Sequence, residues 1–259
     1  MNAEPSPLYA AAFGAAPGRW PLPPAATPVE RWWRAVAAAG QGRYASARTE
    51  LAEIRRAPGG AALDSLAHST EASLLRQLGW HLLARRWDGR ALALADGGPA
   101  HADSLVGLAA DALGVGRFAA AGELLGRARR PPTDLRVRVR LAWVSAELAM
   151  ATGHGADAVR SAEAGLDVAE EFGSARHVVK TRLVLAAALC STGRLDDARG
   201  HGDQVLDATE RHGLLPLRWA VSGLLADIGS ARGTRDELLA INEACAVAVE
   251  RRGGRWRHR

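Results

Sequence analysis

The feature that most constrains this chain is a regular recurrence of glycine and alanine. Glycine recurs at intervals of 37, 37, 37, 40 and 40 residues, at Gly42, Gly79, Gly116, Gly153, Gly193 and Gly233. An alanine precedes each of these glycines by seven residues, at Ala35, Ala72, Ala109, Ala146, Ala186 and Ala226. Another follows by five residues, at Ala47, Ala84, Ala121, Ala158 and Ala198, until Leu238 takes its place in the last unit. A period of this length predicts an array of stacked supersecondary units.

Helix packing explains why the two small residues recur together. The turn between antiparallel helices often needs a residue with positive φ, which glycine adopts without steric cost. We expect the flanking alanines to face each other where the paired helices cross, at about 8 Å between their axes. Leucine at Ala72 or Ala146 should overpack that crossing. The sequence therefore predicts an all-α fold of about six helix-turn-helix units.

The chain divides into three parts. Residues 1–27 hold six prolines, which predicts an extended arm that is either loose or docked on the first unit by Trp20. Residues 28–252 carry the repeats, and residues 253–259 form a basic tail. We expect the first helix of each unit at 28–40, 64–78, 101–114, 137–152, 176–192 and 215–229. We expect the second helices at 44–56, 80–94, 118–130, 155–171, 195–212 and 234–251.

Composition and charge narrow the class of protein. The 259 residues are 48% hydrophobic and 24% charged, as in an ordinary folded protein. The net charge of +5 equals the charge of the arginines in residues 251–259, so the rest of the chain is neutral. Cys190 and Cys245 match no metal or redox spacing, and the first residues do not resemble a signal peptide. No apolar run could span a membrane, so we expect a cytoplasmic protein without a membrane partner.

The repeated units resemble the tetratricopeptide repeat family. The segments GRYASA (42–47) and GRFAAA (116–121) carry the family's glycine, its aromatic residue two positions later and its following alanine. Leu51 and Leu125 match the large apolar residue that comes next. The other units keep less of the pattern, and the period exceeds the family's by three to six residues. The resemblance covers about 28–252 and implies a right-handed solenoid of period 37–40, with a concave groove lined by the first helices.

Within that groove the resemblance gathers candidate binding residues: Arg76, Arg140, Trp143, Glu147, His177 and Lys180. Arg140, Trp143 and Glu147 are three and four residues apart, so they share one helix face. An aromatic ring beside cations is typical of an interaction hot spot. Lys180 is the only lysine in a chain that otherwise uses arginine. We interpret the cluster as a site for an acidic protein or peptide segment; the alternative is a solvated face.

The basic tail offers a second type of partner. Arg255, Arg257 and Arg259 could contact phosphates, which makes a nucleic-acid- or RNA-polymerase-associated factor the alternative function. No helix-turn-helix or zinc signature accompanies the tail, however. A solvated terminus with no partner is the simpler interpretation.

Catalytic motifs are absent from the sequence. The chain has no phosphate-binding GxxxxGKS loop, no HExxH, no GxSxG and no paired CxxC. We therefore expect no enzymatic activity, no cofactor and no metal site. The expected function is that of a non-catalytic adaptor or regulatory scaffold that binds a protein or peptide in its groove.

Overall fold

The computed structural model describes residues 6–57, 59–130 and 134–258, and these contain thirteen α-helices and no strand. Twelve helices form six consecutive pairs. The first helices of the pairs are α2 (Pro28–Gly40), α4 (Ala61–Gln77), α6 (Gly98–Leu113), α8 (Leu135–Ala151), α10 (Ala175–Ser191) and α12 (Leu215–Ile228). The second helices are α3 (Tyr44–Arg56), α5 (His81–Leu94), α7 (Phe118–Ala128), α9 (Gly155–Phe172), α11 (Leu195–Arg211) and α13 (Arg235–Arg251). All twelve end within three residues of the bounds expected from the sequence.

The recurring small residues have the structural roles that packing predicts. The first five recurring glycines adopt positive φ, between 72° and 87°, in the turns that join the paired helices. The sixth pair differs, because Gly229 adopts the positive φ at the end of α12 while Gly233 does not. All the recurring alanines are buried, with at most 5% of their surface exposed, and so is Leu238. Close helix approach within each pair therefore depends on side chains that add almost no width.

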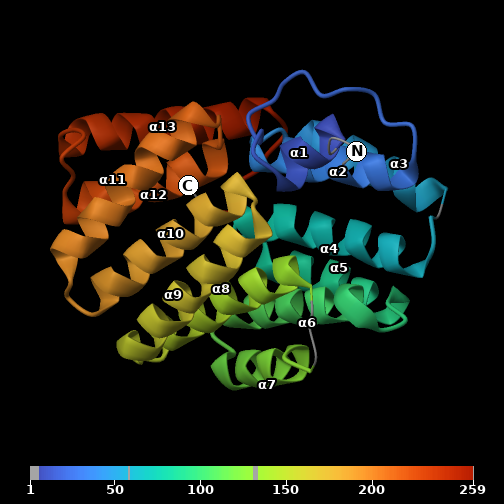
Figure 1. Ribbon diagram of the computed structural model, residues 1–259, viewed down its shortest axis with the longest axis horizontal. Helices are drawn as coiled ribbons and strands as arrows, with labels where there is room; N and C mark the ends of the chain where they lie inside the picture. Colours follow the sequence, from blue (N-terminus) through green and yellow to red (C-terminus); the bar gives the residue numbers. More distant parts are fainter. Residues whose placement is uncertain (1–5, 58, 131–133, 259) are drawn as a thin grey trace.

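Consecutive helices pack against one another along the whole array (Figure 1). The first helices of neighbouring pairs also touch, so α2 contacts α4, α4 contacts α6, and the series continues through α8 and α10 to α12. This arrangement places one helix of every pair on the inside of the molecule. No helix in the described part of the chain combines the length and hydropathy needed to cross a bilayer.

The amino-terminal arm contains a helix that its proline content did not predict. Helix α1 (Pro7–Phe13) begins with a proline at its first position, where the missing N–H is not needed. Its residues Leu8 and Phe13 are buried, and Phe13 belongs to the core built on α2 and α3. Further along the arm, the guanidinium of Arg43 lies 3.7 Å from the centre of the Trp20 ring. The described part of the arm, from residue 6 onward, is thus docked on the first pair.

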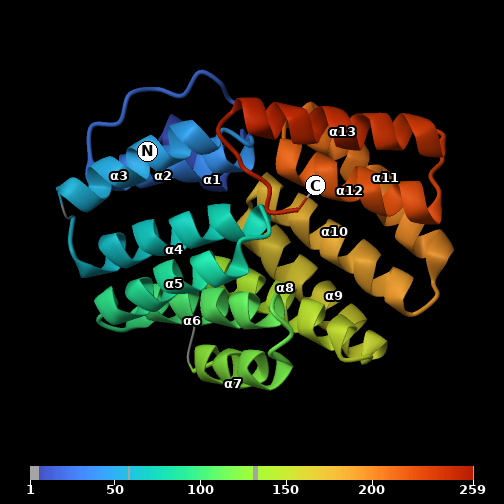
Figure 2. The ribbon, with the colours of Figure 1, turned by 180° about the vertical axis from the view of Figure 1, so that it is seen from behind.

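The two ends of the array meet. Val249, near the end of α13, is fully buried in the same core cluster as Tyr44 of α3. Beyond α13, the backbone N–H of Ala45 donates to the carbonyl of Arg252 over 2.9 Å. Figure 2 shows the carboxyl-terminal segment running down from α13 to the end of α4.

Residues 252–257, which we call the clasp, extend this contact to the second pair. The N–H of Arg257 donates to the carbonyl of Leu78 over 3.0 Å, and the indole N–H of Trp80 donates to the carbonyl of Arg255 over 2.7 Å. Trp256 packs against Trp219 of α12, with 4.6 Å between ring centroids. The inner helices therefore surround a central space, where the sequence indicated only an open groove.

Candidate functional site

The central space is a cavity of about 590 Å³. It is lined by the first helix of all six pairs, with Phe13 of α1 and Trp256 of the clasp added at its edge. Most of the lining is apolar, but α8 and α10 contribute a group of cations. Its volume falls within the range of about 300–1,000 Å³ that is usual for sites holding a drug-sized ligand. The cavity is thus large enough for a small molecule or a short peptide segment.

All six groove residues expected from the sequence line this cavity: Arg76, Arg140, Trp143, Glu147, His177 and Lys180. They come from three first helices, α4, α8 and α10. The tail residues lie elsewhere: the side chains of Arg255 and Arg257 are exposed, and Arg259 lies outside the described residues. The structure thus separates the two groups of candidate residues.

Three charged residues that line the cavity were not among the six candidates: Asp103, Arg136 and Arg176. The sequence carries a signal for each of them. Arg136 lies one helical turn before Arg140, and Arg176 directly precedes His177 in the sequence. Asp103 precedes Arg140 by one repeat period, which indicates that the two occupy equivalent places in neighbouring units.

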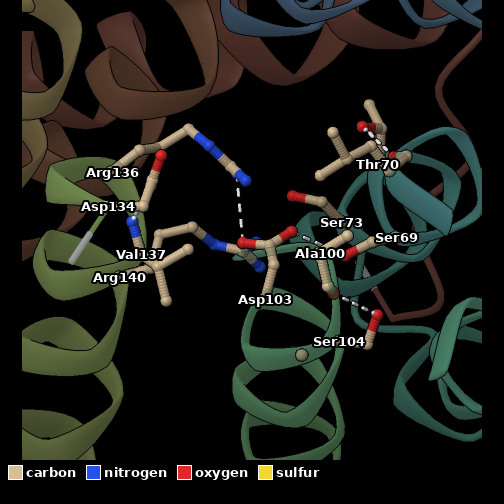
Figure 3. A network of polar contacts seen from close by, with 12 residues as sticks. Ser69, Thr70, Ser73, Ala100, Asp103, Ser104, Asp134, Arg136, Val137 and Arg140 are labelled. Carbon is tan, nitrogen blue, oxygen red and sulfur yellow. Dashed lines mark hydrogen bonds and ion pairs between the residues drawn. The ribbon is translucent and has the colours of Figure 1, made fainter. Parts of the chain in front are cut away.

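Asp103 of α6 holds two of the cavity's arginines in place (Figure 3). Its carboxylate forms ion pairs with Arg140 and, at 3.1 Å, with Arg136, both from α8. The hydroxyl of Ser69, on α4, donates to the second carboxylate oxygen over 3.1 Å. Burial alone would raise the pKa of Asp103, but the two arginines hold it below its ordinary value. The carboxylate therefore stays ionised and ties α4, α6 and α8 together.

Arg76 has its own carboxylate partners, one on α5 and one on α6. Its Nη1 donates to Asp88 Oδ2 and Asp111 Oδ1, both at 2.6 Å. Burial lowers the pKa of Arg76, but the two carboxylates outweigh it and raise the pKa above the ordinary value. Burial raises the pKa of Asp88 to about 7. Because Gly107 has no side chain, Asp88 can approach α6: a Cβ at this position would lie 2.3 Å from Asp88 Oδ2.

Arg176 and Lys180, both on α10, lack such partners. Neither makes an ion pair or a hydrogen bond with any other described residue, and the Nε of Arg176 is buried without an acceptor. Burial lowers the pKa of Arg176 to about 10, and the nearby charges of Arg136 and Arg140 act in the same direction. Burial also lowers the pKa of Lys180, although Glu147 opposes this. These two cations therefore face the cavity without neutralisation by direct contact.

An aromatic wall stands next to the cations. The ammonium of Lys180 lies 4.3 Å from the centre of the Trp143 ring, within cation–π distance. The His177 ring stacks on Trp143 at 5.4 Å between centroids and meets Phe172 edge-on at 5.0 Å. Burial, with the cations around it, lowers the pKa of His177 well below its ordinary value. His177 is consequently a neutral part of the wall at physiological pH.

No protein-family model matches the chain, and a search of the curated proteins found no match. Among the residues that the structure describes, no group of three or more histidines, cysteines or carboxylates is arranged to hold a metal ion.

Proposed function

We propose that this protein is a non-catalytic, cytoplasmic binding protein, an adaptor or regulator that takes a short acidic segment of a protein or peptide into its central cavity. The observation that carries the proposal is the cavity of about 590 Å³, lined by the first helix of every pair and by cations from α8 and α10. A mostly apolar wall with a few convergent charged groups is typical of a ligand-binding site.

We also propose that the six pairs are tetratricopeptide-like repeats, and that they form a right-handed solenoid whose two ends are in contact. The regular period, the glycine turns and the contacts between successive first helices support this interpretation. In a solenoid the inner helices present an extended concave surface to a partner. Joining the ends would convert that surface into a chamber and limit the partner to a short segment.

Two polar groups of the cavity already have partners within the protein, which supports a binding function over a catalytic one. Asp103 accepts contacts from Ser69, Arg136 and Arg140. His177 is hydrogen-bonded to Ser174, with 2.8 Å between Nδ1 and Oγ, and is packed between aromatic rings. Groups held in this way organise a site well, but they are not free to exchange protons with a substrate.

The test is binding of a library of labelled five-residue peptides, sorted by their number of aspartates and glutamates. We expect wild-type protein to prefer acidic over neutral and basic peptides. Ala187→Phe, which adds a ring to the cavity wall on α10, should abolish binding. Ala93→Phe, at an exposed position on α5, is the matched control and should bind as wild type does. Absence of saturable binding, or equal binding by Ala187→Phe, would contradict the proposal.

The alternative function, nucleic-acid binding by the tail, has few exposed basic groups to support it. The backbone of the tail is bonded to the turn between α4 and α5, and the exposed arginines among its described residues are Arg255 and Arg257. Two phosphate contacts on a DNA duplex would give a salt slope of about −1.8, which corresponds to weak binding. A steeper slope that disappears in Arg255→Ala/Arg257→Ala would favour this alternative over the peptide proposal.

A further inference from the structure

We infer that Arg176 and Lys180 bind a carboxylate of the ligand, and that the apolar wall beside them binds an apolar body attached to it. This inference rests on the proposed function and names the chemistry that the cavity recognises. The carboxylate could belong to a peptide or to a free organic acid, since both present the same group to the site.

The charges at this end of the cavity do not balance. Four cations gather there, Arg136, Arg140, Arg176 and Lys180, and the carboxylates among them are Asp103 and Glu147. Four positive and two negative charges leave a surplus of two positive charges. Asp103 offsets one of the two charges of Arg136 and Arg140. Glu147 lies near Lys180 without forming an ion pair with it, and Arg176 has no carboxylate partner among the described residues. An anionic ligand would neutralise the surplus.

A buried cation without a partner is costly to the folded state. Buried charges in proteins are ordinarily paired, and a buried donor without an acceptor calls for a specific reason. The Arg176 side chain is half-buried, it lacks an ion pair, and its buried Nε has no acceptor. Arg76, in the same cavity, shows the usual solution with its two aspartates. The contrast indicates that the partner of Arg176 is not part of this chain's described residues.

Geometry favours shared recognition of one anion. Arg176 and Lys180 are four residues apart on α10, so their side chains lie on the same face of the helix. Gly40, at the end of α2, makes room for Arg176 to reach across: a Cβ on Gly40 would lie 2.7 Å from Arg176 Cδ. A guanidinium offers two parallel N–H donors that match a carboxylate, and an ammonium adds a compact charge. The pair can therefore hold a carboxylate from two sides.

The apolar part of the cavity wall indicates which chemical group the carboxylate of the ligand is attached to. Apolar side chains from four first helices face the cavity: Leu113, Met150, Leu183, Leu217 and Leu224. Burying an apolar body against them is favourable by about 25 cal/mol per Å². A ligand with charge throughout would leave this surface unused, so a carboxylate on an apolar body fits best.

The experiment compares acids with their neutral amides. The probes are N-acetyl-leucyl-leucine and its carboxyl-terminal amide for the peptide source, and octanoate and octanamide for the free acid. We expect wild-type protein to bind at least one acid tenfold or more tightly than its amide, and the acid that binds identifies the source. Arg176→Met and Lys180→Met should lose this preference. Arg182→Met, which removes a cation of the same helix outside the cavity lining, is the matched control and should keep it.

A second measurement needs no ligand at all. Without added probe, Arg176→Met should melt about 2–4 °C above wild type, because a half-buried unpaired charge is replaced by an apolar chain of similar length. Arg182→Met should not, since Arg182 pairs with Glu170 at the surface. A lower melting temperature for Arg176→Met would overturn the inference and make Arg176 a structural residue.

The two proposals fail in different ways. If wild type binds acid and amide equally, and Ala187→Phe abolishes both, the cavity binds ligands but Arg176 and Lys180 do not select them. If acidic peptides and all four probes fail to bind, the proposed function fails as well.

Discussion

The indole Nε1 of Trp143 on α8 donates a hydrogen bond to the hydroxyl of Thr181 on α10, 2.8 Å away. Trp32 on α2 makes the same bond to Thr70 on α4, over 2.9 Å, and in both cases the acceptor lies 38 residues further along the chain. The repeat thus extends beyond small residues to polar contacts between units. Because Trp143 also faces Lys180, this hydrogen bond positions part of the proposed ligand site.

The Trp143–Thr181 bond can be measured with a double-mutant cycle. We expect Trp143→Phe and Thr181→Val to show a coupling free energy of about 1 kcal/mol in urea unfolding, the usual net contribution of a hydrogen bond. The Trp32–Thr70 pair should give a similar value. Additive effects at both pairs would show that these bonds do not stabilise the array.

A pair of glycine substitutions tests the packing of Asp88 against α6. Gly107→Ala should destabilise the protein by about 1–3 kcal/mol, because its Cβ would collide with the Asp88 carboxylate that Arg76 holds. Gly126→Ala, in the last turn of α7 with open space around it, should instead stabilise by up to about 1 kcal/mol through helix propensity. Chemical denaturation measures both. Equal effects would contradict the close approach at Gly107.

The depressed pKa of His177 has a consequence for stability against pH. The unfolded chain binds a proton at His177 near its ordinary pKa of 6.5, while the folded protein resists protonation. The unfolded state therefore holds more protons as the pH falls below about 6.5, and the folded state loses stability there. His177→Gln does not titrate at this position. Its free energy of unfolding should therefore rise relative to that of wild type by up to about 1.4 kcal/mol for each pH unit below 6.5. Parallel profiles of unfolding free energy between pH 7 and 5 would refute this.

The clasp should stabilise the junction between the two ends of the array. Trp256 is partly buried, packs on Trp219 and lies beside the core of the first pair. We expect Trp256→Ala to cost about 2 kcal/mol, less than the 3–5 kcal/mol typical of a fully buried ring. Amide exchange should also accelerate in α3 and at the end of α13. His258→Ala, at an exposed position next to the clasp, is the control and should change neither measurement.

Much of the fold could be predicted from the sequence because its signals are local. Positive-φ glycines and buried alanines recur with the period of the helix pairs, so the positions of α2 to α13 follow from short stretches of chain. Helix α1 was missed because prolines dominate its surroundings, although Pro7 itself occupies a position that favours helix. Its burial depends on contacts of Phe13 with distant residues such as Phe172 and His177, which no local pattern reports.

The sequence by itself determined the all-helical pairing, the turns and the identity of six residues that face inward. Only the tertiary structure decided that the two ends meet, since contacts such as the hydrogen bond from Ala45 to Arg252 join residues about two hundred positions apart. It also decided which cations are neutralised. Arg76 and Arg176 are the same residue type on equivalent helices, but one meets two aspartates and the other meets none. Charge pairing depends on which side chains share the interior, and that is set by the closure of the array rather than by spacing along the chain.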